Sequence, residues 1–251
     1  MSVFKGPAAV LLTIVLLVLT ATKSTAGATV KKRDRGPLNH AELKEAERRL
    51  SEMGYLTGRV DGTIDSDTRI GLITFQKWEG RKITTRLTRS EFNAIRDANA
   101  PQPKDSGYRH VEVDLDRQVL LLTDSEGVVK TILPVSTGSG KRYKEKRMSG
   151  LAYTPRGRFR IYGKISGWRR SPLGLLYYPN YFSDGLAIHG NPSVPYAPRS
   201  HGCVRIPMFA ASEISKQLPV GSIILIYDAQ SFVSAKQWAE EDKQKQSRNI
   251  P

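Results

Sequence analysis

Residues 186–207 read LAIHGNPSVPYAPRSHGCVRIP and contain the chain's only cysteine, Cys203, with two of its four histidines, His189 and His201. A lone thiol cannot form an internal disulfide, and a thiol near imidazoles suggests a nucleophile with a general base. The thiolate is the attacking species, and a neighbouring protonated histidine lowers the pKa of a thiol. Gly202 lets the backbone bend sharply beside the sulfur and present N–H groups to an oxyanion. The stretch therefore predicts a cysteine-dependent catalytic site.

Two other interpretations of the same residues stay open on composition alone. A free cysteine is most often a small buried hydrophobic residue, and either histidine could be a hydrogen-bonded structural residue. The thiol and the two imidazoles could also supply three ligands to zinc, although their spacing matches no common zinc motif.

The complete motif favours the catalytic interpretation. Ile188-His-Gly, followed by Ser200-His-Gly-Cys-Val-Arg205, closely resembles the signature of the L,D-transpeptidases with a YkuD-type catalytic domain. The segment Thr154-Pro-Arg-Gly-Arg-Phe159 resembles the Thr-Pro-x-Gly-x-Phe segment of the same family. The resemblance covers about residues 108–228 and implies a mainly β, sandwich-like domain with the cysteine in a cleft.

The resemblance also implies a role for each residue that carries chemistry. Cys203 is expected to be the nucleophile, and His189 the general base or the ion-pair partner of the thiolate. The backbone carbonyl of Gly190 is expected to orient the other ring nitrogen of His189. No metal and no cofactor are implied.

Four further residues of the motif are expected to support this pair. His201 and Gly202 are implied to shape the site, with backbone N–H groups facing the oxyanion. Ser200 and Arg205 match motif positions that support the loop or bind a substrate carboxylate. A guanidinium suits a carboxylate because it can form two parallel hydrogen bonds.

The implied reaction is a two-step acyl transfer on peptidoglycan. The cysteine attacks the amide between the third residue and the terminal D-Ala of a stem peptide, and D-Ala leaves. An amine on the third residue of another stem then resolves the thioester, which joins the two third residues. Carbapenem-type β-lactams are expected to acylate the same cysteine. The alternatives are an L,D-carboxypeptidase that trims the terminal D-Ala and a non-enzymatic wall-binding protein.

A helical segment precedes the catalytic domain. Capping signals at Asn39, at Asp65 or Ser66, and at Thr88 each precede apolar residues at helical spacing and predict three helices. The order of residues in this segment resembles a three-helix peptidoglycan-binding domain: Leu43-Lys-Glu-Ala-Glu-Arg-Arg-Leu50, Gly54-Tyr-Leu56, Asp61-Gly62, Thr68 and Phe75-Gln76. The predicted fold class is α+β, with a small three-helix domain followed by a mainly β catalytic domain.

The pattern within the catalytic domain predicts strands and loops. Apolar Val111, Val113 and Leu115 alternate with polar residues, which is typical of a strand with one buried face. The basic segment 141–147 is expected to be a mobile exposed loop. The aromatic segment 168–184 is expected either to pack in the core or to form a loop over a substrate cleft.

The first 28 residues have the pattern of a secretory signal: Lys5, an apolar run at 8–19 and then small residues, with cleavage expected after Ala26 or Ala28. The pattern predicts an exported protein of the periplasm or cell wall. An uncleaved anchor is the alternative and would be the only membrane contact. The formal net charge of +15 suits an anionic wall polymer. Nucleic acid is not expected as a partner, because no common nucleic-acid-binding motif occurs.

Shifts in composition, with proline-bearing polar linkers, divide the chain into six expected parts. They are a signal peptide or anchor at 1–28, a basic linker at 29–37, a peptidoglycan-binding-like helical domain at 38–99, a linker at 100–107, an L,D-transpeptidase catalytic domain at 108–228 and a polar C-terminal tail, helical or disordered, at 229–251.

Overall fold

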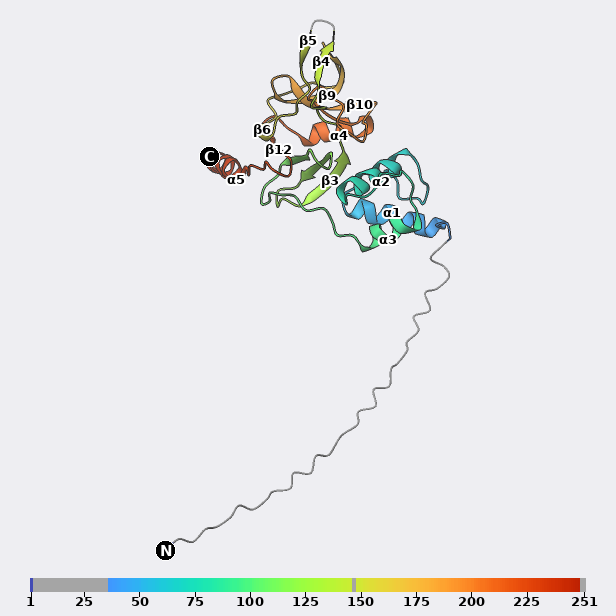
Figure 1. The fold of residues 1–251 in the computed structure, drawn as a ribbon. Coiled ribbons are helices and arrows are strands. Elements are labelled where there is room, and N and C mark those ends of the chain that lie inside the picture. The colour runs from blue at the N-terminus through green and yellow to red at the C-terminus, as the bar shows by residue number, and fades with distance from the viewer. Residues whose placement is uncertain (2–35, 146–147, 249–251) are drawn as a thin grey trace. The chain divides into compact units, whose positions relative to one another are not determined.

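A computed structural model describes residues 36–145 and 148–248, together with Met1. The expected signal peptide or anchor and nearly all of the basic linker lie in residues 2–35, outside the described residues. Five helices and twelve strands occur in the described part (Figure 1). None of these helices is long and apolar enough to cross a membrane. Three helices come first and a mainly β domain follows, which confirms the predicted fold class; two further helices lie within and after the β domain, so the described residues contain five.

Along the described part of the chain, three helices come first and eleven strands follow; a fourth helix precedes the last strand, and a fifth helix follows it. The helices are α1 (His40–Glu52), α2 (Ser66–Trp78), α3 (Arg89–Asp97), α4 (Met208–Gln217) and α5 (Lys236–Arg248). The strands are β1 (Val111–Asp114), β2 (Val119–Thr123), β3 (Val129–Pro134), β4 (Arg142–Glu145), β5 (Met148–Leu151), β6 (Gly157–Arg160), β7 (Gly163–Lys164), β8 (Trp168–Ser171), β9 (Gly174–Ser183), β10 (Leu186–Asn191), β11 (Val204–Pro207) and β12 (Ile223–Tyr227).

The first helices begin where their capping residues predict. The Asn39 side chain accepts the Glu42 N–H, and the Glu42 carboxylate accepts the Asn39 N–H, which forms a complete capping box. At α3, Thr88 accepts the Glu91 N–H as expected. The Glu91 carboxylate does not complete a second capping box, because it pairs with Arg81 instead.

The three N-terminal helices share a core with the first sheet. That sheet has the strand order β3-β2-β1-β12-β6, with β1 parallel to β12. Val119, Leu121 and Ile132 of the sheet are fully buried in one cluster with Leu50 and Phe75 of the helices. The helices therefore do not bury their apolar faces only against one another, and the sheet completes their core.

Lys77 of α2 reinforces this junction. Its Nζ donates hydrogen bonds to the backbone carbonyls of Gln118 and Val135, each at 3.1 Å. Burial lowers the pKa of Lys77 to about 8. A buried ammonium group needs such acceptors, so α2 is held to the sheet at one defined position.

A second sheet contains β10 and β11, the strands that carry His189 and Arg205 of the motif. Its order is β11-β10-β9-β7. Strand β7 pairs with residues 180 and 181 of β9, whereas β8 pairs with residues 174–177 at the start of β9. Apolar side chains of both sheets and of α4 form one buried cluster, which makes the β domain sandwich-like. Its members include Val111, Val113, Leu120, Leu133, Ile188, Val204, Ile206, Ala211, Ile214 and Ile224.

Strand β1 differs from the expected one-sided pattern, because all four of its residues are buried and Leu115 lies beyond it. The Glu112 carboxylate accepts the N–H groups of Lys104 and Asp105 and the hydroxyl of Tyr227. The linker before β1 thus folds over this face of the sheet, and the polar position becomes a buried acceptor.

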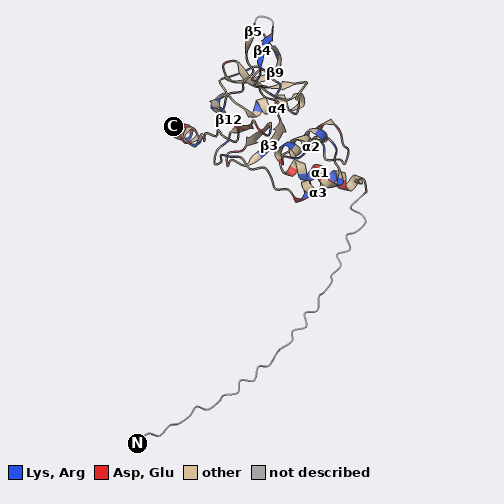
Figure 2. Ribbon diagram, viewed as in Figure 1, with Lys and Arg blue, Asp and Glu red and all other residues tan. Residues whose placement is uncertain are grey.

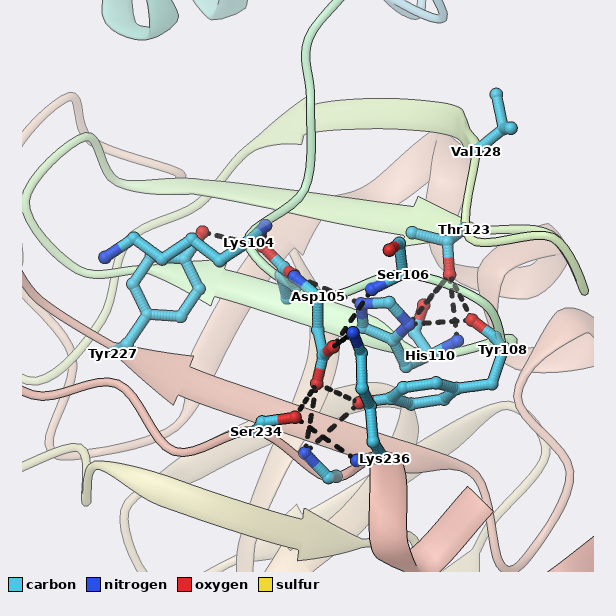
Figure 3. Close-up of polar contacts among 12 residues, drawn as sticks. Lys104, Asp105, Ser106, Tyr108, His110, Thr123, Val128, Tyr227, Ser234 and Lys236 are labelled. Carbon is cyan, nitrogen blue, oxygen red and sulfur yellow. Dashed lines mark hydrogen bonds and ion pairs between the residues drawn. The ribbon is translucent and has the colours of Figure 1, made fainter. Parts of the chain in front are cut away.

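The C-terminal segment, expected as a polar tail that is helical or disordered, forms the helix α5, and the start of this segment packs against the same region. Ala235 and Ala239 are buried in a cluster with Tyr108 and Tyr227. The Asp105 carboxylate accepts hydrogen bonds from the Ser234 hydroxyl, the Ala235 N–H and the Tyr108 hydroxyl (Figure 3). These long-range bonds hold the start of α5 to the linker.

Strands occur both in the basic segment 141–147, which was expected to be a loop, and in the aromatic segment 168–184, which was expected either to pack in the core or to form a loop. Residues 142–145 form β4, which pairs with β5 in a two-stranded antiparallel hairpin; residues 146 and 147 lie outside the described residues. Arg142 and Lys144 are exposed on this hairpin, among the basic positions coloured blue in Figure 2. Most of the aromatic segment forms the β8–β9 hairpin, which both packs on the core and reaches the site described below.

Candidate active site

The ring of His189 is held in one orientation and one tautomer. His189 lies in β10 opposite Arg205 of the parallel strand β11, and it is 2% exposed. Its Nδ1 lies 2.9 Å from the backbone oxygen of Gly190. A carbonyl oxygen can only accept, so Nδ1 carries the proton and Nε2 of the neutral ring is unprotonated. Nε2 forms no hydrogen bond with any described residue, and it is therefore available as a base.

The position of Gly190 has no room for a side chain. A Cβ there would lie 2.6 Å from the Cβ of Ala211 in α4 and 3.1 Å from the ring of Tyr177 in β9. Glycine therefore allows α4 and β9 to pack directly against the strand that carries the histidine.

The turn before Cys203 is fixed by hydrogen bonds within the turn and by one from Thr154. The Ser200 hydroxyl accepts the Gly202 N–H at 3.0 Å and donates to the Cys203 carbonyl at 2.6 Å. The Thr154 hydroxyl donates to the Gly202 carbonyl at 2.7 Å. Gly202 has a φ of +140°, and a Cβ there would lie 2.7 Å from the Tyr153 carbonyl oxygen. The structure thus places Ser200 inside the turn, where it supports the cysteine loop.

Two backbone N–H groups of this turn remain open. The N–H of Gly202 is engaged by Ser200, whereas those of His201 and Cys203 form no hydrogen bond within the described chain. Free N–H groups beside a nucleophile are the donors that an oxyanion requires.

His201 contacts a different element from His189. Its Nε2 lies 3.0 Å from Oε1 of Glu145 in β4, and its ring centroid lies 4.6 Å from that of Tyr143. The residue therefore joins the cysteine turn to the β4–β5 hairpin. Among the described residues no three His, Cys, Asp or Glu side chains are placed to hold a metal ion, so the zinc interpretation finds no assembled ligand set.

A cavity of about 320 Å³ brings the motif residues together. Tyr143 and Met148 of the β4–β5 hairpin form one wall, and the turn that joins β8 to β9 forms another. Five of the predicted site residues line the same cavity: His189, Ser200, His201, Cys203 and Arg205. Gly190 and Gly202 are not among the residues that line the cavity; their backbone groups bond to the side chains of His189 and Ser200.

The electrostatics of the site favour a neutral resting pair. Burial raises the pKa of the Cys203 thiol, against the lowering effects of a hydrogen bond from the Ala187 backbone and of the Arg205 charge. Burial lowers the pKa of His189 to about 4; the hydrogen bond to Gly190 opposes this, and the Arg205 charge adds to it. Near pH 7 the pair is thus a thiol and a neutral imidazole. Within the described residues no hydrogen bond joins the sulfur to the ring.

Arg205 places a positive charge in the cavity. Its N–H and C=O both bond to the backbone of Ser136, each at 3.1 Å, which fixes its position in β11. Its guanidinium is half-buried, and burial lowers its pKa while the nearby Cys203 and Glu145 raise it. This group can bind a carboxylate that enters the cavity.

Comparisons with known proteins agree with this geometry. Residues 108–226 match the profile of the YkuD family, the L,D-transpeptidase catalytic domain, and residues 39–95 match that of a peptidoglycan binding domain. A crystal structure of the L,D-transpeptidase from Xylanimonas cellulosilytica is 34% identical, with a TM-score of 0.70. The match covers 77% of this chain and 96% of that one. This chain belongs to the L,D-transpeptidase family.

More distant structures carry the same family name. An L,D-transpeptidase from Stackebrandtia nassauensis is 20% identical over 77% of this chain and 93% of that one, with a TM-score of 0.45. An LD transpeptidase in complex with imipenem is 21% identical over 47% and 58%, with a TM-score of 0.38. No curated protein matches the chain.

The site of this L,D-transpeptidase includes residues that motif analysis did not select. Thr154 bonds to the cysteine turn, and Glu145 and Tyr143 contact His201. The resemblance of residues 154–159 to the Thr-Pro-x-Gly-x-Phe segment is a usable signal for Thr154, which is its first residue. Nothing in the basic sequence around Glu145 indicated a contact across 56 residues.

Proposed function

We propose that this L,D-transpeptidase cross-links the third residues of peptidoglycan stem peptides through a thioester on Cys203. The observation that carries the proposal is the shared cavity, in which a thiol, an imidazole with an unbonded Nε2 and a guanidinium meet. Family membership supports the reaction class, and the cavity supports the roles of the individual residues.

In the first step, the Cys203 sulfur attacks the carbonyl carbon of the amide that precedes the terminal D-Ala. Nε2 of His189 takes the thiol proton and delivers it to the nitrogen of the departing D-Ala, as its C–N bond breaks. The N–H groups of Cys203 and His201 stabilise the oxyanion, and Arg205 binds the carboxylate of the D-Ala.

In the second step, the amine of an acceptor stem attacks the thioester. His189 takes the amine proton and returns it to the sulfur as the carbon–sulfur bond breaks. The thioester retains the energy of the cleaved amide, so the two steps need no nucleotide and no cofactor. The two hairpins that wall the cavity restrict water, which would otherwise hydrolyse the thioester.

The neutral resting pair changes how the thiol should be tested. A thiol with a raised pKa reacts slowly with alkylating reagents near neutral pH, even when it is catalytic. Slow alkylation of Cys203 therefore does not distinguish a nucleophile from a structural cysteine, and substrate turnover is the measurement that does.

The proposal places the enzyme outside the cytoplasm, in the periplasm or cell wall, on the pattern of its first 28 residues. The helical domain would contribute to wall binding, in line with its family match. Carbapenem-type β-lactams would acylate Cys203, because their strained amide presents a carbonyl to the same nucleophile.

Mass spectrometry of the purified protein incubated with disaccharide-tetrapeptide tests the proposal, with Cys203→Ala as the control. Dimers that have lost one D-Ala, formed only by the unsubstituted protein, are expected. Tripeptide without dimer would assign the L,D-carboxypeptidase activity instead. Equal products from Cys203→Ala would refute the role of the thiol.

A further inference from the structure

A second cleft, of about 500 Å³, lies between the helical domain and the catalytic domain. Asp67 and Ile70 of α2 line one side of it, and Tyr196 and Phe209 of the catalytic domain line the other. None of these four residues belongs to the site around Cys203. The proposed reaction at Cys203 does not explain the presence of this cleft.

The cleft adjoins the Cys203 cavity. Asn191 lines both of them, and it lies two residues after His189 at the end of β10. The loop that follows is anchored near Tyr196, because the Ser136 hydroxyl donates to the carbonyl of Ala197. A ligand that reached from the cavity past Asn191 would therefore meet the Tyr196 side chain on a loop whose backbone is anchored.

The chemistry of the lining favours an uncharged ligand with apolar faces and hydroxyl groups. Tyr196 and Phe209 are 48% and 46% exposed, so both rings offer apolar surface to a ligand in the cleft. Asp67 and Asn191 add polar groups that can bond to hydroxyls. The chain has 39 Lys and Arg residues, yet none of those that the structure describes lines this cleft. An anionic peptide would find a carboxylate there and no cation.

We propose that this cleft binds the glycan strand of peptidoglycan, with sugar rings against Tyr196 and Phe209. The proposal rests on the proposed function, because it places the glycan in the cleft while the attached stem peptide occupies the Cys203 cavity. It assigns saccharide binding to the junction of the two domains rather than to the helical domain alone.

Binding of tri-N-acetylchitotriose, measured by isothermal titration calorimetry on the chain without residues 1–28, tests the site separately from catalysis. We expect Tyr196→Ala to weaken binding about tenfold, as for an aromatic contact at the centre of an interface. Tyr196→Phe keeps the ring and should bind nearly as the unsubstituted protein does. Phe232→Ala, which removes an exposed ring outside the cleft, is the matched control.

The salt dependence of binding separates a glycan from a charged ligand. Binding of a neutral trisaccharide should not change between low and high salt, because screening acts on charges. Absence of trisaccharide binding, or an equal loss in Tyr196→Ala and Phe232→Ala, would overturn the proposal.

Kinetics then connect the cleft to turnover. The preference for disaccharide-tetrapeptide over the sugar-free tetrapeptide, taken as a ratio of kcat/KM values, should fall about tenfold in Tyr196→Ala and persist in Phe232→Ala. An unchanged preference in Tyr196→Ala would contradict the proposal. If neither substrate reacted while the trisaccharide bound at Tyr196, the proposed function would fail and the glycan site would stand.

Discussion

The β domain buries two histidines, His110 and His189, in surroundings that differ in one decisive respect. Both rings place Nδ1 2.9 Å from a backbone carbonyl close in sequence. Nε2 of His110 lies 3.1 Å from the fully buried Glu112 carboxylate, so both of its nitrogens have partners (Figure 3). Nε2 of His189 has no partner among the described residues, and the ring lines a cavity that also contains Cys203.

The comparison shows that burial does not by itself indicate a catalytic histidine. A ring with both nitrogens bonded is a structural connection, here among Tyr108, Glu112 of β1 and Thr123 of β2. A ring with one nitrogen bonded and the other open to a cavity is oriented and still able to accept a proton. The histidines should therefore differ in what their replacement changes.

The largest expected effect is on catalysis by His189→Asn. Because removal of a general base costs about 100-fold to 10,000-fold, we expect kcat to fall by about 1000-fold. His110→Asn is the matched variant: it should lower the melting temperature, while turnover per folded molecule stays close to that of the unsubstituted protein. Steady-state kinetics with thermal unfolding measure both. Equal losses of turnover in the two variants would contradict the assignment of His189 as the general base and His110 as a structural residue.

The next largest effect is expected on stability, when the Glu112 carboxylate that bonds to His110 is removed. Glu112 bonds to His110, Tyr227 and two backbone N–H groups, so Glu112→Ala leaves several buried donors without an acceptor. We expect a loss of about 3–5 kcal/mol in the free energy of unfolding, measured by urea denaturation. Glu126→Ala, at an exposed carboxylate, should change it by about 0.5 kcal/mol or less. A similar small change for Glu112→Ala would show that the network contributes little.

The lowered pKa of His189 predicts an acid-sensitive contribution to stability. The unfolded ring takes up a proton below its ordinary pKa of 6.5, whereas the folded ring does so only near 4. Between these pH values the unfolded state binds more protons, so the free energy of unfolding falls as the pH falls, by about 3 kcal/mol from this group. The full stability is present above pH 6.5.

Two measurements check this pH dependence. Urea denaturation at pH 7 and pH 4 should show a smaller loss of stability in His189→Asn than in the unsubstituted protein. The acidic limb of kcat/KM should lie near pH 4, because His189 stays neutral down to that value. An acidic limb near pH 6.5 would mean that the ring is not desolvated in the free enzyme.

The smallest effect is expected at the cysteine turn. Ser200→Ala removes the hydroxyl that joins the Gly202 N–H to the Cys203 carbonyl, while the thiol and His189 remain. Loss of these bonds should loosen the turn and lower the rate of acyl-enzyme formation about tenfold. Ser125→Ala, in the exposed turn between β2 and β3, is the control. Rapid quenching with mass spectrometry gives the rates, and equal rates would show that the turn does not depend on Ser200.

Local sequence determined a large part of the fold. Asn39 and Thr88 predicted the starts of two helices, because capping signals and side-chain periodicity act over a few residues. The resemblance of the motif around Cys203 to the L,D-transpeptidases is confirmed by the family comparison. Motifs of this kind are visible in sequence because neighbouring residues must shape one turn.

Only the tertiary structure decided how these parts meet. Lys77 bonds to carbonyls 41 and 58 residues away, Asp105 holds the start of α5 across 130 residues, and Glu145 reaches His201 across 56. Periodicity and capping carry no information on such distances. The neutral state of the Cys203–His189 pair likewise depends on desolvation by many distant side chains, since burial is a property of the folded chain and not of any segment of its sequence.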